Sequence, residues 1–135
     1  INLGNAGDVL LKLKRLEEAR EYFIQAIEIC DESFPVAAGA FRGSLAFLLA
    51  QENSVNEALH VLTIGEPLVL VYPSEHGKFL CKKAKVLHLA IQQEEAKKIL
   101  AQAEAIAKEL NHTEDSELGK ECKEVKKFLA SPLLK

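Results

Sequence analysis

The chain repeats one local pattern three times: Leu16-Glu-Glu-Ala19-Arg-Glu-Tyr-Phe23, Val55-Asn-Glu-Ala58-Leu-His-Val-Leu62 and Gln93-Glu-Glu-Ala96-Lys-Lys-Ile-Leu100. Each copy places an acidic residue directly before an alanine and a large apolar residue four positions after that alanine. The spacings between successive alanines are 39 and 38 residues. A fixed period of this size predicts stacked supersecondary units rather than a globule built around one core.

The bulk composition is typical of a globular chain and excludes some classes of function. The 135 residues are 48% hydrophobic and 27% charged, which suits a single domain. No apolar run approaches the roughly 18 residues that suggest a membrane span, so we expect no membrane partner. The net charge of −3 argues against a general nucleic-acid binder. Because the chain begins at Ile1 and has no methionine, we expect a fragment of a longer protein. We also expect this protein to be cytoplasmic.

The residues of chemically active types form no recognisable catalytic or metal-binding motif. The three cysteines are far apart and form no CxxC motif, which favours buried free thiols in a reducing compartment. The four histidines show no metal-ligand spacing, and neither a nucleophile elbow nor a phosphate-binding loop is present. We therefore expect no enzyme activity, no metal and no cofactor. The three cysteines are Cys30, Cys81 and Cys122, and the four histidines are His60, His76, His88 and His112.

Helix start and stop signals divide the chain into seven expected helices. Asn53-Ser54 is expected to turn the chain, with Ser54 and Glu57 forming a capping box, and Ser74 is expected to cap the following helix. The expected helices cover residues 1–13, 16–31, 35–51, 55–72, 74–91, 93–110 and about 115–130. The last one has an apolar stripe and charged outer faces, as a helix that closes a stack requires.

The segment from Gly65 to Tyr72 gives conflicting signals. Gly65 and Pro67 favour a break in the helix, and Leu68-Val-Leu-Val-Tyr72 has the composition of a strand. However, the number of residues from Ala58 to the next expected helix is about the same as the number from Ala19 to the helix expected at Pro35. An isolated strand would also have no partner. The repeat therefore predicts one helix, kinked at Pro67 and ending before Pro73.

These hairpins resemble the tetratricopeptide repeat, in which small residues allow close helix packing and large ones fill the space between helices. The period is four or five residues longer than the usual length of about 34, and it is similar to the repeats of kinesin light chains and of bacterial signalling proteins and regulators. The residues that match are Leu3, Ala6, Gly7, Leu10, Ala19, Phe23 and Ala26, then Leu45, Ala46, Leu49, Ala58, Leu62 and Gly65, then Leu80, Ala84, Leu87, Ala96, Leu100 and Ala103.

The resemblance implies an all-α, right-handed α-solenoid of three hairpins, at about 1–33, 34–73 and 74–112, followed by a capping helix at about 115–130. It also implies a protein–protein interaction module, a scaffold or sensor segment whose concave groove binds a peptide or helix. The groove-facing positions would be Asp8, Leu11 and Lys12, then Gly43, Phe47, Ala50 and Gln51, then Lys78, Cys81, Lys82, Lys85 and His88. Lysines beside an apolar side chain favour an acidic partner with an apolar anchor.

Three alternatives to this groove stay open at this point. The lysines are also consistent with an exposed helix face that only contacts water. Leu3 and Leu10 at the start of the first repeat would favour self-association of the chain into a homo-oligomer. A helical domain that binds a small ligand or catalyses a reaction is a third alternative, which no motif supports.

Overall fold

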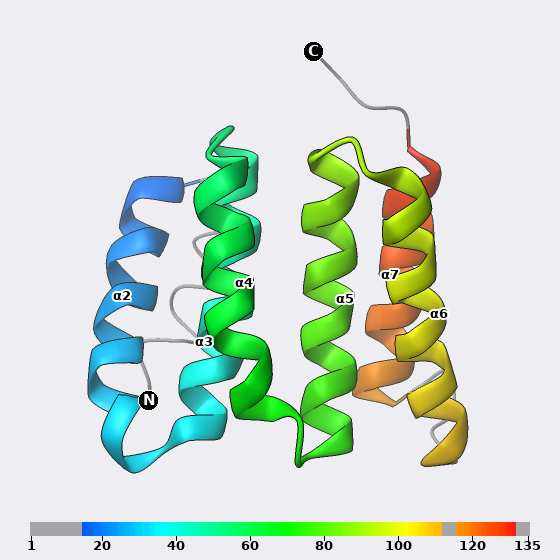
Figure 1. Cartoon of the computed structure of the whole chain (residues 1–135), viewed down its shortest axis with the longest axis horizontal. Helices are drawn as coiled ribbons and strands as arrows, with labels where there is room; N and C mark the ends of the chain where they lie inside the picture. The colour runs from blue at the N-terminus through cyan, green and yellow to red at the C-terminus, as the bar shows by residue number, and fades with distance from the viewer. Residues whose placement is uncertain (1–14, 112–115, 132–135) are drawn as a thin grey trace.

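The computed structural model describes residues 15–111 and 116–131, and in these ranges the chain is helical with no strand (Figure 1). The expected helix over residues 1–13 lies outside the described residues, as do the groove candidates Asp8, Leu11 and Lys12. The described helices are α2 (Leu16–Ser33), α3 (Pro35–Gln51), α4 (Val55–Val69), α5 (Pro73–Leu89), α6 (Gln93–Glu109) and α7 (Glu117–Ala130).

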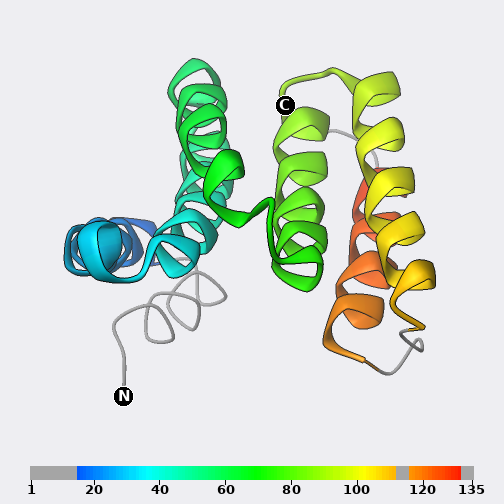
Figure 2. The same cartoon turned by 60° about the horizontal axis from the view of Figure 1, so that its bottom comes forward.

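Successive helices run up and down and pack side by side along the longest axis of the molecule (Figure 1). Two further contacts skip a helix: α3 packs on α5, and α5 packs on α7. Within the described residues, α4 contacts neither α2 nor α6. Figure 2 shows the α5–α6–α7 group beside the α3–α4 hairpin, with α2 at the far end. The first helices of the α3–α4 and α5–α6 hairpins therefore form one continuous layer together with α7.

The three repeated alanines occupy equivalent places in this arrangement. Ala19, Ala58 and Ala96 are completely buried in the first turns of α2, α4 and α6. The amide of each alanine donates to the carbonyl of the residue just before its helix. The large apolar residues four positions on are also buried, namely Phe23, Leu62 and Leu100. The sequence pattern thus marks the start of each second helix and the side that faces the core.

α3 and α4 approach each other closely because two glycines lie at their contact. A Cβ atom added at Gly39 would lie 2.9 Å from the carbonyl oxygen of Gly65 and equally close to side-chain atoms of Leu68 and Val69. A Cβ added at Gly65 would lie 2.9 Å from the Cβ of Arg42 and 3.0 Å from the ring of Phe79. Any side chain at either position would therefore force the two helices apart.

Helix α4 includes the first part of the segment whose signals conflict, so the expected helix is confirmed as far as Val69. The expected end at residue 72 is wrong, because residues 70–72 form a turn, and none of residues 68–72 is in a strand. Pro67 lies inside α4, which ends at Val69. Proline removes one backbone donor and disfavours a helix interior. Burial offsets this cost, because Val69 is fully buried and Leu68 packs against Gly39.

Two of the expected helix caps are wrong. Ser54 does precede α4, but its side chain makes no capping hydrogen bond. The cap position of α5 is Tyr72, and Pro73 begins the helix, since its fixed φ angle suits the first turn. Among the described helices, only α7 has a side-chain cap: the hydroxyl of Ser116 accepts from the amide of Gly119 at 3.0 Å.

The turns after α3 and α5 have the same backbone geometry. Asn53 and Ile91 both adopt left-handed conformations, with φ of 67° and 62°. This conformation is ordinary for asparagine and strained for a β-branched residue. Both turns close in the same way, with hydrogen bonds from Ser54 N to Leu49 O, Asn53 N to Ala50 O, Gln92 N to Leu87 O and Ile91 N to His88 O. This pair of bonds is the Schellman motif.

The close contact of α3 and α4 predicts that Gly39→Ala destabilises the protein although alanine is the better helix former. The propensity gain of about 1 kcal/mol is outweighed by overlap with three atoms. We expect a net loss of about 2 kcal/mol in the free energy of unfolding, measured with urea. Gly43→Ala should cost less, because its nearest neighbour is the Phe79 ring at 3.1 Å. A Gly39→Ala protein as stable as wild type would contradict the close contact.

The matching turns predict opposite effects of a reciprocal exchange. Ile91→Asn should stabilise the protein by about 1 kcal/mol, and Asn53→Ile should destabilise it by a similar amount. Ile91 is 74% exposed, so removing its side chain loses little packing. Ile91→Val keeps the branched Cβ and should leave the thermal midpoint nearly unchanged. Equal midpoints for all these variants would show that neither turn is strained.

Candidate binding groove

The surface shared by α3, α5 and α7 contains three lysines of α5. Lys78, Lys82 and Lys85 are four and three residues apart, which places them along one face of the helix. Between the three helices lies a pocket of about 140 Å³. Its walls are formed by Ala40, Phe41, Ser44, Glu75, Lys78, Phe79, Lys82, Glu117 and Glu121.

Lys78 is held by carboxylates at one end of this pocket. Its ammonium lies 3.1 Å from Glu117 of α7 and 3.2 Å from Glu75 of its own helix. Burial alone would lower the pKa of Lys78, but the hydrogen bonds to Glu117 and Glu75 outweigh burial and raise it. Lys78 therefore stays charged and connects α5 to the first turn of α7.

Lys82 and Glu121 face each other in the middle of the pocket. The Lys82 ammonium donates to the hydroxyl of Ser44 on α3 at 3.1 Å. None of the ion pairs within the described residues includes Lys82. Burial raises the pKa of the Glu121 carboxyl, and the positive charges of Lys82 and Lys85 only partly oppose this. The middle of the pocket thus holds a lysine whose closest polar partner is a neutral hydroxyl.

Lys85 lies over an aromatic cluster at the other end of the groove. Its ammonium is 4.5 Å from the centroid of the Phe47 ring, a cation–π geometry. Burial, with the nearby charge of Lys82, lowers the pKa of Lys85. The Phe128 ring of α7 packs edge-on against Phe47 at 5.8 Å and against His88 at 5.4 Å. The last turn of α7 therefore covers this end of the face.

The structure places the expected groove residues in four different surroundings. Lys78 and Lys82 line the pocket. Phe47 and His88 pack against Phe128, Lys85 lies over Phe47, and His88 is only 3% exposed. Gln51 is exposed near the end of α3. Gly43 and Ala50 are buried, and Cys81 is completely buried against α7, so the expectation that these three residues face a partner is wrong.

The sequence-based prediction missed the contribution of α7. Glu117, Glu121 and Phe128 all face the groove, but we expected α7 only to close the end of the stack. One signal was present, because Glu117, Glu121 and Glu124 have the same four-and-three spacing as the lysines of α5. Matching charge patterns on two helices favour their packing together.

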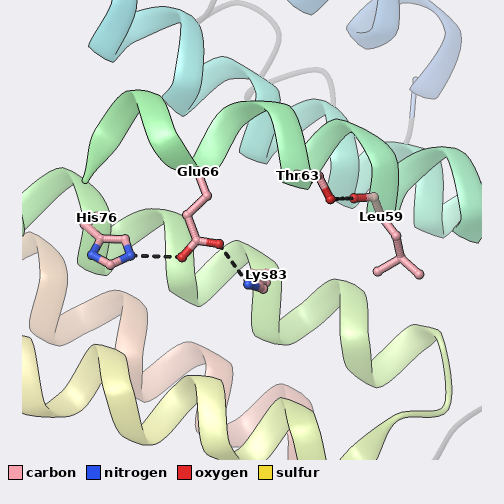
Figure 3. Close-up of polar contacts among 5 residues, drawn as sticks. All are labelled: Leu59, Thr63, Glu66, His76 and Lys83. Atoms are coloured by element: carbon pink, nitrogen blue, oxygen red, sulfur yellow. Dashed lines mark hydrogen bonds and ion pairs between the residues drawn. The ribbon is translucent and has the colours of Figure 1, made fainter. Parts of the chain in front are cut away.

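A second, larger pocket of about 420 Å³ lies between α4 and α5. Its walls are mostly apolar, formed by Leu59, Leu62, Thr63, Glu66, Pro67, Leu70 and Lys83. Figure 3 shows Glu66 pointing from α4 towards α5. One oxygen of its carboxylate lies 2.8 Å from Lys83 Nζ, and the other oxygen lies 3.0 Å from His76 Nε2. Glu66 thus ties α4 to α5 close to Pro67.

The electrostatics of Glu66 favour its charged form. Burial alone would raise the pKa of the carboxyl, but the hydrogen bonds from Lys83 and His76 lower it below the ordinary value of 4.5. Such a group stabilises the folded state above the ordinary pKa, and this contribution is lost as the pH falls through the folded-state pKa.

The part of the chain that the structure describes has no feature of a metal site or of a membrane span. In that part, no group of three or more His, Cys, Asp or Glu side chains could hold a metal ion. None of the described helices combines the length and apolar character needed to cross a membrane. No family model, curated protein or solved structure matches the chain.

The position of Glu66 predicts a pH-dependent loss of stability in Glu66→Gln. At pH 7 the variant should lose about 1 kcal/mol of unfolding free energy, because Lys83 and His76 lose their charged acceptor. The difference from wild type should shrink as the pH falls below 4.5, because the unfolded-state carboxyl is protonated there, and it should vanish once the pH falls through the lower pKa of the folded state. Urea unfolding across this pH range measures both effects.

Glu28→Gln is the matched control, because Glu28 is exposed on α2 and the change removes the same charge. It should alter the unfolding free energy by less than about 0.5 kcal/mol. A Glu66→Gln loss that stays constant across the pH range would contradict the role of the carboxylate.

Proposed function

We propose that this chain is a protein–protein interaction module of the tetratricopeptide-repeat type, a right-handed solenoid whose groove binds an acidic peptide or helix with an apolar anchor. Two features support the repeat assignment. The α3–α4 and α5–α6 hairpins share the same turn geometry and the same buried alanine, and α3, α5 and α7 form one layer. In this proposal the chain is a scaffold or sensor segment of a longer cytoplasmic protein and has no catalytic role.

The observation that carries this proposal is the environment of Lys82. Its ammonium lines the pocket, donates to a neutral hydroxyl and belongs to none of the ion pairs within the described residues. A carboxylate that entered the pocket would form a charge-assisted hydrogen bond with it, stronger than the bond to Ser44. Three glutamates also line the pocket. Glu75 and Glu117 pair with Lys78, and burial raises the pKa of Glu121. Lys82 is therefore the group that a partner's carboxylate would contact in this proposal.

Apolar side chains beside Lys82 supply the second half of the proposed recognition. Phe41 and Phe79 line the same pocket, and Phe41 is only partly buried. An apolar side chain next to the acidic residue of a partner would cover the Phe41 ring and exclude water from the new ion pair. Partly buried aromatic side chains of this kind often contribute most of the affinity at interfaces.

The helix α7 gives an example within the chain of the ligand that this face accepts. It combines acidic residues that face the lysines of α5 with an aromatic ring that packs between Phe47 and His88. A partner that used the open part of the groove would likewise combine a carboxylate with an apolar group. This parallel supports the choice of an acidic partner.

A random-peptide display library screened on the full chain tests the proposal. Selected peptides should be enriched in Asp and Glu next to Phe or Leu, and their affinity should fall with added salt. In fluorescence anisotropy titrations, Lys82→Gln should weaken a selected peptide by about fivefold to tenfold.

Lys97→Gln on the exposed surface of α6 removes the same charge away from the groove and should leave the affinity unchanged. Two results would contradict the proposal. One is a selected set with no acidic preference, and the other is equal affinity for the Lys82→Gln and Lys97→Gln proteins.

A further inference from the structure

Two of the three cysteines lie against each other where α5 packs on α7. Cys81 of α5 and Cys122 of α7 are 41 positions apart in the sequence, yet their sulfur atoms are separated by only 3.9 Å. Cys81 is 0% exposed and Cys122 is 6% exposed. The third cysteine, Cys30, lies on α2, a helix that contacts neither α5 nor α7 within the described residues.

The pair lies in the main contact between α5 and α7. Both cysteines belong to the apolar core that contains Leu118 and Val125 of α7. On the N-terminal side of the cysteines in both helices, Lys78 of α5 pairs with Glu117 of α7. On their C-terminal side, Phe128 of α7 packs against His88 of α5. A covalent bond between the two sulfur atoms would therefore hold α7 on α5 between its two other attachments.

We propose that Cys81 and Cys122 form a reversible disulfide when the protein meets hydrogen peroxide, and that this bond locks α7 into the groove. The sulfur atoms would approach by roughly 2 Å to reach disulfide bonding distance. Side-chain rotation of cysteine can supply this movement, because both residues are in helices that already pack together. The proposal is independent of the proposed function, since it concerns only the chemistry of the pair.

The two thiols have different roles in the reaction. The hydrogen bond with Cys81 lowers the pKa of the Cys122 thiol, whereas the same bond, with burial, raises the pKa of Cys81. Cys122 is also the more exposed of the two. Its thiolate is therefore the nucleophile, and Cys81 remains the neutral thiol that resolves the intermediate.

The reaction balances in two steps. The Cys122 thiolate attacks one oxygen of hydrogen peroxide, the O–O bond breaks, and the products are a sulfenic acid and hydroxide. The Cys81 sulfur then attacks the Cys122 sulfur and the S–O bond breaks. The hydroxyl group leaves with the Cys81 proton as water, and the first hydroxide takes up the proton that Cys122 had released. Overall, two thiols are oxidised to a disulfide and one peroxide is reduced to two waters.

Treatment of the purified full chain with hydrogen peroxide tests this inference. After denaturation and alkylation, the number of reactive thiols should fall from three to one. Mass spectrometry of proteolytic fragments should find the peptide of Cys81 joined to that of Cys122, and dithiothreitol should separate them. Closing this loop should raise the thermal midpoint by roughly 10 °C.

The three single serine variants provide the controls. Cys30→Ser should respond as wild type does, whereas Cys81→Ser and Cys122→Ser should show no internal disulfide and no rise in the thermal midpoint. The wild-type measurement alone decides the case if a serine variant fails to fold. Three remaining thiols, a crosslink that includes Cys30, or oxidation of Cys122 to sulfinic acid without a crosslink would each overturn the proposal.

Discussion

The close approach of helices at small residues is the constraint on which the rest of the structure depends. At Gly39 and Gly65, α3 and α4 are so near that no side chain fits at either position. Ala58 and Ala96 have the same role one repeat apart, because each is completely buried at the start of a second helix. Close packing within a hairpin leaves the other side of its first helix free to contact the next hairpin. This is how α3, α5 and α7 come to lie in one layer.

The surface chemistry follows from this layer. Because α7 lies along α5, the lysines of α5 face carboxylates of α7 at one end and aromatic rings at the other. Between these ends, Lys82 lines the pocket, donates to a hydroxyl of α3 and belongs to none of the ion pairs within the described residues. The same docking brings Cys122 to Cys81. The proposed groove and the thiol pair are thus two consequences of one helix contact.

Local sequence patterns predicted the helices well, because helix periodicity and turn residues act over a few positions. The expected bounds of 35–51 for α3 match the structure, and the repeat assigned Pro67 to a helix against its own propensity. The caps were less predictable. A serine before a helix offers a capping hydroxyl. At Ser54, however, the backbone turn of the Schellman motif already determines how the chain enters α4. The Ser54 hydroxyl therefore makes no capping hydrogen bond.

The contents of the groove could be predicted only in part. Phe47, Lys78, Lys82 and Lys85 were chosen from their places in the repeat, and each does lie at or beside the α3–α5 surface. The docking of α7 onto that surface joins residues about one repeat apart, such as Cys81 and Cys122. No local pattern encodes such a pairing, and it depends on charge and shape matching between whole helices. For this reason Cys81 was expected to face a partner and instead lies buried.

A nuclear Overhauser measurement between Gly39 and Val69 tests the central claim most directly. One α-proton of Gly39 points where a Cβ would lie, and that position is 2.9 Å from Cγ1 of Val69. The account predicts a strong cross-peak between this α-proton and a Val69 methyl group, with helical amide–amide contacts continuing through residues 68 and 69. Absence of that cross-peak, or extended-chain contacts in the segment after Pro67, would contradict it.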